Sequence, residues 1–231
     1  MAIIKLGPTV AGIRGTVAGL TFSANASGPY IMQWSQSSRP RTLPQSLQRG
    51  RLGQMGAAWA ALSSAQRAAW DTYAADSAQE LTNSLGEAYY ASGYNWFCSC
   101  NTQLLNAGLS TISTAPSGGT PSAPTITGLT FEDDSGSVKA QVTYGASEFA
   151  SDETIVIFAS LVRGQGRSVQ YSGFFLMAAE EDPGASPYDF STACEDKFGY
   201  PNDGDTLFVR VYRQSDEGRR SSVVSLDQGF S

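Results

Sequence analysis

The chain has 231 residues, of which 41% are apolar and 16% are charged, so it can bury one large core or two small ones and lacks the charge excess of disordered segments. It contains no histidine, which excludes the commonest general base and metal ligand and the usual partner of serine and cysteine nucleophiles. No run approaches the roughly 18 apolar residues of a membrane-spanning helix, and the N-terminus lacks the features of a secretory signal, so we expect synthesis in the cytoplasm and no membrane partner.

Charge is distributed unevenly along the chain. Residues 1–108 carry seven basic and four acidic side chains, a net charge of +3, whereas residues 109–231 carry eight basic and seventeen acidic ones, a net charge of −9. All seven basic residues of the first part precede Asp71, its first acidic residue. This division predicts a cationic half that faces an anionic partner and an acidic half that its charge keeps soluble.

Residues 1–40 are predicted to form an extended arm that carries one β-hairpin. Residues 15–23 and 30–35 are rich in β-branched and aromatic side chains, and residues 25–29 between them are typical of a turn. Tyr30, Met32 and Trp34 alternate toward one face. An isolated hairpin is only marginally stable in water, so these strands need support from their own helices or from another subunit.

Three helices are predicted after this arm. Two prolines keep residues 38–44 extended, and the helical period begins at about Gln45. Ser63 and Gln66 form an S-x-x-Q capping box, so a second helix starts there and makes a tight αα-hairpin with the first. The third is expected over residues 86–107 and ends at Gly108. The apolar stripes of the three helices are Leu52, Met55, Trp59, Leu62; Trp70, Tyr73, Ala74, Ser77; and Tyr89, Gly93, Trp96, Phe97, Cys100, Leu104.

The period changes from helical to two-residue alternation beyond residue 124. Residues 110–124 are rich in Ser, Thr, Pro and Gly and predict a linker. Six or seven strands follow, with a short helix over residues 186–200, in a pattern that resembles a fibronectin-III or immunoglobulin-like sandwich. The strands are expected at residues 124–131, 138–144, 154–162, 169–177, 207–211 and 221–226. The predicted class is therefore α+β in two domains, with an arm and helical module at residues 1–109, the linker, and a β-sandwich at residues 125–231.

Acidic clusters at residues 132–134, 180–182 and 202–205 occur in turn-like settings, which favours solvated loops over a catalytic carboxylate pair. Asp203 and Asp205 lack the later ligands of a calcium loop. Cys98, Cys100 and Cys194 are interpreted as buried free thiols. The pI of about 4.6 argues against a dedicated nucleic-acid binder. We expect no enzyme, no cofactor and no metal.

Four blocks in the first 108 residues carry a resemblance to a known family. The chain resembles tailed-phage structural proteins that share an N-terminal module, and the resemblance covers nearly half of its length. In that family the stretch before the first helix often reads N-P-x-T, from which Ser38-Arg39-Pro40-Arg41-Thr42 departs slightly. The blocks are Arg14-Gly15 with Val17, Gly19-Leu20 and Phe22-Ser23; Arg39-Pro40-Arg41-Thr42 with Gln45 and Gln48; Trp59, Leu62, Arg67 and Trp70; and residues 92–97 with Asn101, Leu104-Leu105 and Gly108.

The resemblance implies a virion component. We expect a capsid decoration or cement protein that docks on the major capsid protein or another virion subunit as a homo-oligomer, for which a trimer is one option. Two alternatives stay open: a collar, whisker or tube subunit of the neck or tail, and a carbohydrate-binding adhesive module. Strand addition and arginine–carboxylate pairs would hold the partner, although solvated arginines or phosphate contacts are other interpretations. The expected docking residues are Arg14, Phe22, Tyr30, Trp34, Arg39, Arg41, Arg49 and Arg51.

Overall fold

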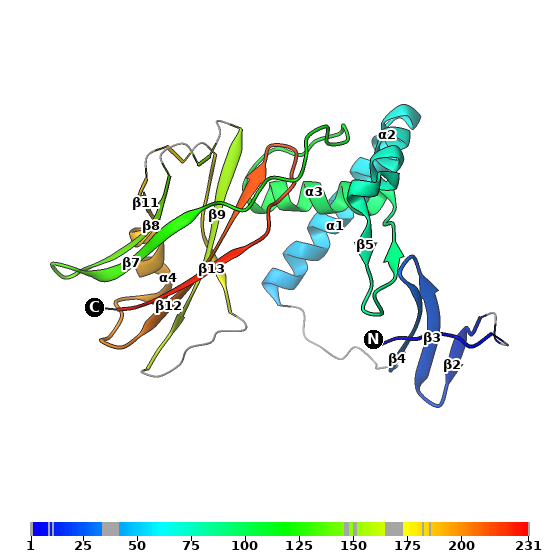
Figure 1. Ribbon diagram of the computed structural model, residues 1–231, viewed down its shortest axis with the longest axis horizontal. Helices are drawn as coiled ribbons and strands as arrows, with labels where there is room; N and C mark the ends of the chain where they lie inside the picture. The colour runs from blue at the N-terminus through cyan, green and yellow to red at the C-terminus, as the bar shows by residue number, and fades with distance from the viewer. Residues whose placement is uncertain are drawn as a thin grey trace. The chain divides into compact units, whose positions relative to one another are not determined.

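The computed structural model describes residues 2–8, 10, 12–33, 42–145, 148–149, 152–164, 173–181, 183–184 and 186–230. The fold is α+β, with four α-helices and several antiparallel sheets among these residues (Figure 1), as the sequence predicted at this level. The chain divides into two compact units, residues 1–102 with 112–115 and residues 103–111 with 116–231. None of the described helices has both the length and the apolar character needed to cross a membrane.

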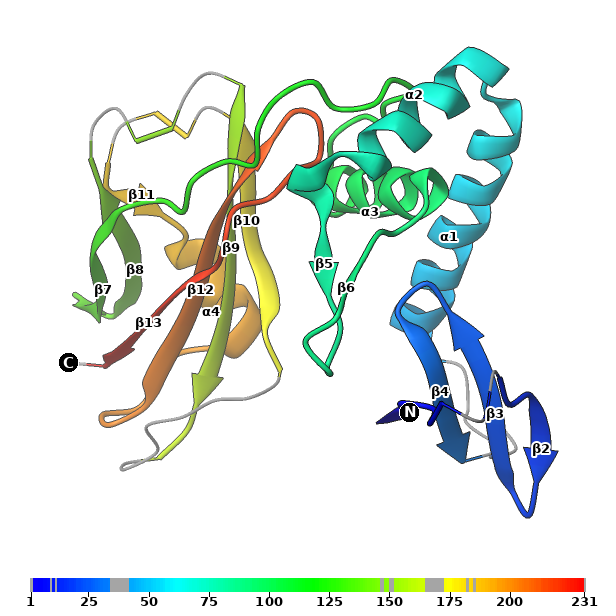
Figure 2. The same cartoon turned by 45° about the vertical axis from the view of Figure 1, so that its right-hand side comes forward.

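The first unit opens with a four-stranded antiparallel sheet rather than a single hairpin. Its strands are β1 (Ala2–Ile3), β2 (Gly15–Val17), β3 (Leu20–Asn25) and β4 (Gly28–Gln33), in the order β1-β4-β3-β2 (Figure 2). The predicted single strand over residues 15–23 is wrong, because the chain reverses at Ala18 and Gly19, which have φ of 50° and 78°. A two-residue turn with positive φ at both positions fits the twist of the flanking strands.

Helices α1 (Leu43–Ala61) and α2 (Ser64–Ala75) each begin with a capping box. The predicted box is confirmed: the Ser63 amide donates to Gln66 Oε1 at 2.9 Å, and the Gln66 amide donates to Ser63 Oγ at 3.2 Å. The equivalent pair of Thr42 and Gln45 before α1 was not predicted. The corner between the helices is tight, but Figures 1 and 2 show the two helices diverging from it instead of packing along their length.

The third helix starts later than the sequence predicted. Helix α3 spans Gly93–Asn106, and the short 3-10 helix η1 (Ser77–Gln79) and a hairpin of β5 (Leu81–Thr82) and β6 (Ala88–Tyr89) precede it. Asn83 fixes this hairpin, because its Oδ1 accepts the amides of Leu85 and Glu87 at 2.9 and 3.0 Å. These local hydrogen bonds replace helix over residues 86–92. At the other end the predicted stop is confirmed, since the Leu109 amide donates to Leu104 O at 2.9 Å and Gly108 has φ of 78°.

Aromatic rings form the core of the helical part. Phe97 lies between Trp59 and Trp70, with ring centroids 5.4 Å from each. Helix α3 crosses α2 so closely at Gly93 that a Cβ there would lie 2.8 Å from the Trp70 carbonyl carbon. The predicted stripe of α1 is buried at Met55 and Leu62, whereas Leu52 is 52% exposed. The core therefore begins only in the second half of α1.

The second unit contains two antiparallel sheets and one helix. Thirteen buried residues, which come from β7, β8, β9 and β12 together with Phe190 and Cys194, form one hydrophobic cluster. The sheet orders are β10-β9-β12-β13 and β11-β8-β7. Residues 186–190, predicted as helix, hold β11 instead, and the predicted strand over residues 169–177 starts outside the described residues. The elements are β7 (Ile126–Asp134), β8 (Ser137–Tyr144), β9 (Glu153–Val162), β10 (Phe175–Glu181), β11 (Tyr188–Asp189), α4 (Ser191–Phe198), β12 (Thr206–Ser215) and β13 (Val224–Gly229).

The segment predicted as a linker is tied down by specific hydrogen bonds. Within the first unit, the buried Asn101 accepts the Ile112 amide at 2.7 Å. Within the second, the Glu217 carboxylate accepts the amides of Ser117 and Gly118 at 2.8 and 3.0 Å. The nearby Arg219 guanidinium donates to the Gly118 carbonyl oxygen. The segment therefore has the composition of a flexible linker, but hydrogen bonds hold its backbone at residues 112, 117 and 118.

Candidate docking surface

The N-terminal sheet has no core of its own. Among the described residues before Met55, none is buried. Val17 is 68% exposed in β2, and Leu43 and Leu47 at the start of α1 are 83% and 64% exposed. An antiparallel sheet normally buries one face against a second layer. Within the described part of the chain, no second layer covers this sheet closely enough to bury any of its side chains.

The strand register assigns the side chains of this sheet to two faces. Phe22 pairs with Ile31, and Val17 pairs with Leu20, so these four apolar side chains share one face. On the opposite face Thr16 and Thr21 lie directly across from each other, with their hydroxyl oxygens 3.0 Å apart. That second face also carries Ile3, Tyr30 and Met32, so apolar side chains occur on both faces of the sheet. The face of Val17, Leu20, Phe22 and Ile31, called the apolar face below, is partly exposed to solvent.

The edges of the sheet are short. β2 has three residues and β1 has two, and each lies at one end of the strand order. An edge strand presents backbone donors and acceptors to which another chain can add a strand. The geometry thus offers two kinds of contact, apolar burial on one face and backbone pairing at the edge.

The structure places five of the eight docking residues that the sequence predicted. Arg14 is exposed just before β2, while Phe22 and Tyr30 are half-buried in β3 and β4 on opposite faces of the sheet. On α1, Arg49 is exposed and Arg51 is half-buried. The other predicted residues, Trp34, Arg39 and Arg41, lie outside the described residues. Phe22 and Tyr30 therefore lie on adjacent strands of one sheet but on opposite faces, so a single flat contact cannot cover both.

A tether between the sheet and the β5–β6 hairpin was missed by the sequence analysis. The Asn83 side-chain amide donates to Ser27 O at 2.8 Å, and Lys5 Nζ lies 3.0 Å from Glu87 Oε1. The hydrogen bond from Lys5 lowers the pKa of the Glu87 carboxyl, although both side chains are largely solvated. No local pattern could reveal this tether, because it joins residues more than fifty positions apart.

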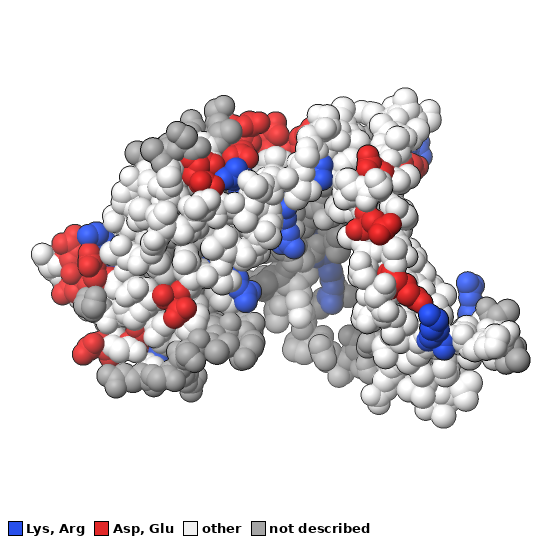
Figure 3. Space-filling view, in the orientation of Figure 1, with Lys and Arg blue, Asp and Glu red and all other residues white. Residues whose placement is uncertain are grey.

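Acidic side chains of the second unit serve its turns. Figure 3 shows a group of them at the tip of the β7–β8 hairpin, where Asp133 Oδ1 accepts the Gly136 amide at 2.8 Å. Asp205 contradicts the expectation of a solvated loop: it is 2% exposed and accepts the amides of Gly164 and Asn202, both at 2.9 Å. No described group of three or more His, Cys, Asp and Glu side chains could hold a metal ion.

The three cysteines are free thiols. Cys100 and Cys194 are buried as predicted, whereas Cys98 is only half-buried. Burial raises the pKa of the Cys194 thiol to about 12, so this thiol stays protonated and unreactive at neutral pH. These groups act as small apolar side chains.

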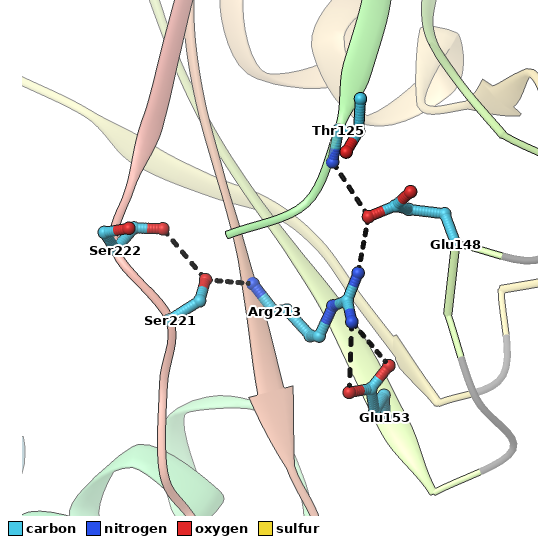
Figure 4. A network of polar contacts seen from close by, with 6 residues as sticks. All are labelled: Thr125, Glu148, Glu153, Arg213, Ser221 and Ser222. Carbon is cyan, nitrogen blue, oxygen red and sulfur yellow. Dashed lines mark hydrogen bonds and ion pairs between the residues drawn. The ribbon is translucent and has the colours of Figure 1, made fainter. Parts of the chain in front are cut away.

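Arg213 is the centre of a nearly buried ionic network in the second unit (Figure 4). The Arg213 guanidinium lies 2.5 Å from Glu148 Oε1 and 3.3 Å from Glu153 Oε2, and its side chain is only 11% exposed. Glu148 Oε1 also accepts the Thr125 amide at 2.8 Å. The network thereby connects β9 and β12 with the start of β7, which is a structural role.

Comparisons with protein-family models, curated proteins and solved structures found no match to this chain.

Proposed function

We propose that this chain is a non-enzymatic structural protein of a tailed-phage particle, and that the N-terminal sheet and the first half of α1 dock on a neighbouring virion subunit. The observation that carries the proposal is the lack of any buried described side chain before Met55, although the sheet has an apolar face. A surface of this kind is completed when a partner covers it. The resemblance of the four N-terminal blocks to phage structural proteins supports the proposed role in a phage particle.

Apolar burial would provide most of the docking energy. Covering an exposed Val, Leu or Phe side chain contributes about 1.5–3 kcal/mol, whereas an exposed ion pair contributes about 0–1 kcal/mol. Val17, Leu20, Phe22 and Ile31 would therefore dominate the affinity. The arginines of the first unit would mainly steer the approach to an acidic partner.

For the second unit we propose an immunoglobulin-like sandwich of the fibronectin-III type. Three strands, β7, β8 and β11, form one sheet, and four strands, β10, β9, β12 and β13, form the other. One hydrophobic cluster contacts both sheets. Strand β10, the fourth strand of this unit along the chain, lies at the edge of the larger sheet. This division of the strands favours the fibronectin-III arrangement. Helix α4 between β11 and β12 is an addition to that plan.

Within the particle, we propose the role of a capsid decoration or cement protein, with the major capsid protein as partner and the second unit displayed to solvent. Such a protein stabilises the shell because it binds only the assembled state. Equivalent lattice positions would suit a symmetric homo-oligomer, for which a trimer is one option. Its location would be the virion, after synthesis in the host cytoplasm.

The copy number of the chain in purified particles tests this role. A head decoration protein is expected in hundreds of copies, whereas a collar, whisker or tube subunit is expected in about six to eighteen. Quantitative mass spectrometry gives the number, and cryo-electron microscopy gives the position. The decoration role fails if density for the chain is found only at the neck or tail, and the virion assignment fails if no copies are present.

A further inference from the structure

Two arginines of the second unit have an unusual environment. This part of the chain carries seventeen acidic residues and eight basic ones. Arg213 and Lys139 pair with carboxylates, at 2.5 Å and 2.7 Å. Arg210 and Arg220, in contrast, form no ion pair with any carboxylate among the described residues, and both lie over aromatic rings. Their positive charges are therefore still available to an anion.

Both arginines line one cavity on the outer face of the larger sheet. Arg210 and Phe158 are directly paired on neighbouring strands, and Tyr212 follows on the same face. The Arg210 guanidinium lies 4.0 Å from the Phe174 ring centroid, and that of Arg220 lies 5.9 Å from the Tyr212 centroid. The cavity has a volume of about 350 Å³, and its lining includes Phe158, Phe174, Arg210, Tyr212, Arg220 and Val223.

The lining of this cavity defines a class of ligand. A guanidinium that lies over a ring face keeps the N–H groups of its own planar edge open, and these can bind a carboxylate through two parallel hydrogen bonds. Phe158, Phe174 and Val223 supply apolar surface for the C–H groups of a small ring. The net charge of −9 beyond residue 108 opposes highly charged phosphates more than a single carboxylate. The volume suits one or two monosaccharide units.

We infer that this cavity binds an acidic sugar residue, with the carboxylate held by Arg210 and Arg220 and the sugar ring against Phe158 and Phe174. This inference does not depend on the docking role of the N-terminal sheet. It assigns a binding activity to the face of the second unit that points away from the hydrophobic cluster.

Calorimetric titration of the full chain tests the site. The probes are glucuronate, galacturonate and N-acetylneuraminate, with glucose and galactose as uncharged counterparts and adenosine monophosphate as a phosphate-bearing ring. We expect saturable binding of at least one acidic sugar and at least tenfold weaker binding of the uncharged sugars. Arg220→Gln should weaken binding at least tenfold, and Arg220 is exposed, so this variant retains its fold.

Arg67→Gln is the matched control, since Arg67 is an exposed arginine of α2 in the other unit and its loss should leave binding unchanged. A second variant, Arg210→Gln, checks the other guanidinium. The inference is overturned if none of the acidic sugars binds, if Arg220→Gln binds as tightly as the wild type, or if adenosine monophosphate binds more tightly than every acidic sugar.

Discussion

Two four-stranded antiparallel sheets in this chain illustrate opposite outcomes of the same pattern. In the sheet β10-β9-β12-β13, side chains of β9 and β12 such as Ile157 and Val209 are fully buried in a cluster shared with the second sheet. In the sheet β1-β4-β3-β2, no described side chain is buried. Both contain alternating β-branched and aromatic residues. Alternation therefore predicts strands, but a core requires a second layer to cover the apolar face.

Different interactions stabilise the second unit and the N-terminal sheet. The second unit holds itself together with its own cluster and with the Arg213 network, whereas the N-terminal sheet relies on backbone pairing and on the tether through Asn83 and Lys5. A region of the second kind has a low local stability in isolation, and a partner that bound it would raise that stability. The following changes test this difference, in order of decreasing expected effect.

Removing the Arg213 guanidinium should have the largest effect. Arg213→Met leaves the carboxylates of Glu148 and Glu153 in a mostly buried position without their cation, and we expect the free energy of unfolding of the second unit to fall by about 3–5 kcal/mol. Circular dichroism of the strands during urea unfolding measures the loss. All four tryptophans lie between residues 34 and 96, so their fluorescence follows the first unit separately.

Lys139→Met is the matched control for that experiment. Lys139 also pairs with a carboxylate, at 2.7 Å from Glu132, but its side chain is 35% exposed and solvent screens the pair, so we expect a much smaller loss than for Arg213→Met. Equal losses in the two variants would contradict a special role for the nearly buried network.

The crossing of α2 and α3 should be the next most sensitive point. Gly93→Ala places a Cβ 2.8 Å from backbone atoms of Trp70 and Asp71, which cannot move without separating the helices. We expect the first unit to lose about 2–3 kcal/mol, measured by tryptophan fluorescence in urea. In Gly53→Ala a Cβ meets nothing within 4 Å, and this variant should gain up to about 1 kcal/mol because alanine favours the helix. A neutral Gly93→Ala variant would show that the helices separate easily.

A charge on the apolar face of the N-terminal sheet distinguishes folding from docking. Val17→Asp should change the unfolding free energy by less than about 0.5 kcal/mol, because Val17 is 68% exposed. Binding to purified particles should weaken by a factor of about ten to a hundred, since a charge would be buried at the contact. Co-sedimentation with particles that lack the chain measures binding. Thr16→Asp on the opposite face is the control, and equal binding by both variants would exclude the apolar face as the contact.

The sequence predicted the elements that local chemistry controls and missed those that depend on distant residues. The capping box of Ser63 and Gln66 and the stop at Gly108 were predicted correctly because each is complete within a few positions. Strand β6 and the residues that follow it up to Gly93 were predicted as helix because the apolar spacing around Tyr89 fits a helical period, while the hydrogen bonds of Asn83 decide the structure. Partners such as Arg213 and Glu148 lie too far apart along the chain for any local pattern.

The same limit applies to the candidate surface. Residues of the N-terminal sheet could be nominated for docking from their types, but the face on which each lies depends on the register. Phe22 pairs with Ile31, which puts it on the face opposite Tyr30. A two-residue turn at Ala18 and Gly19 sets the register of β2, and the sequence analysis did not predict that turn.

Acidification should weaken the hydrogen bonds between Glu217 and the segment before β7. We expect this change to have the smallest effect on stability of the changes considered. Burial raises the pKa of Glu217, but the amides of Ser117 and Gly118 outweigh it, so the pKa is lowered relative to an ordinary glutamate. A lowered folded-state pKa means that the hydrogen bonds contribute stability above the unfolded-state pKa of about 4.3, and that this contribution is lost as the pH falls through the folded-state pKa. Hydrogen exchange at these two amides should therefore accelerate on acidification relative to other amides. Glu217→Gln carries no titrating group and should exchange with no such step, and a step of the same size in that variant would assign the effect to another carboxylate.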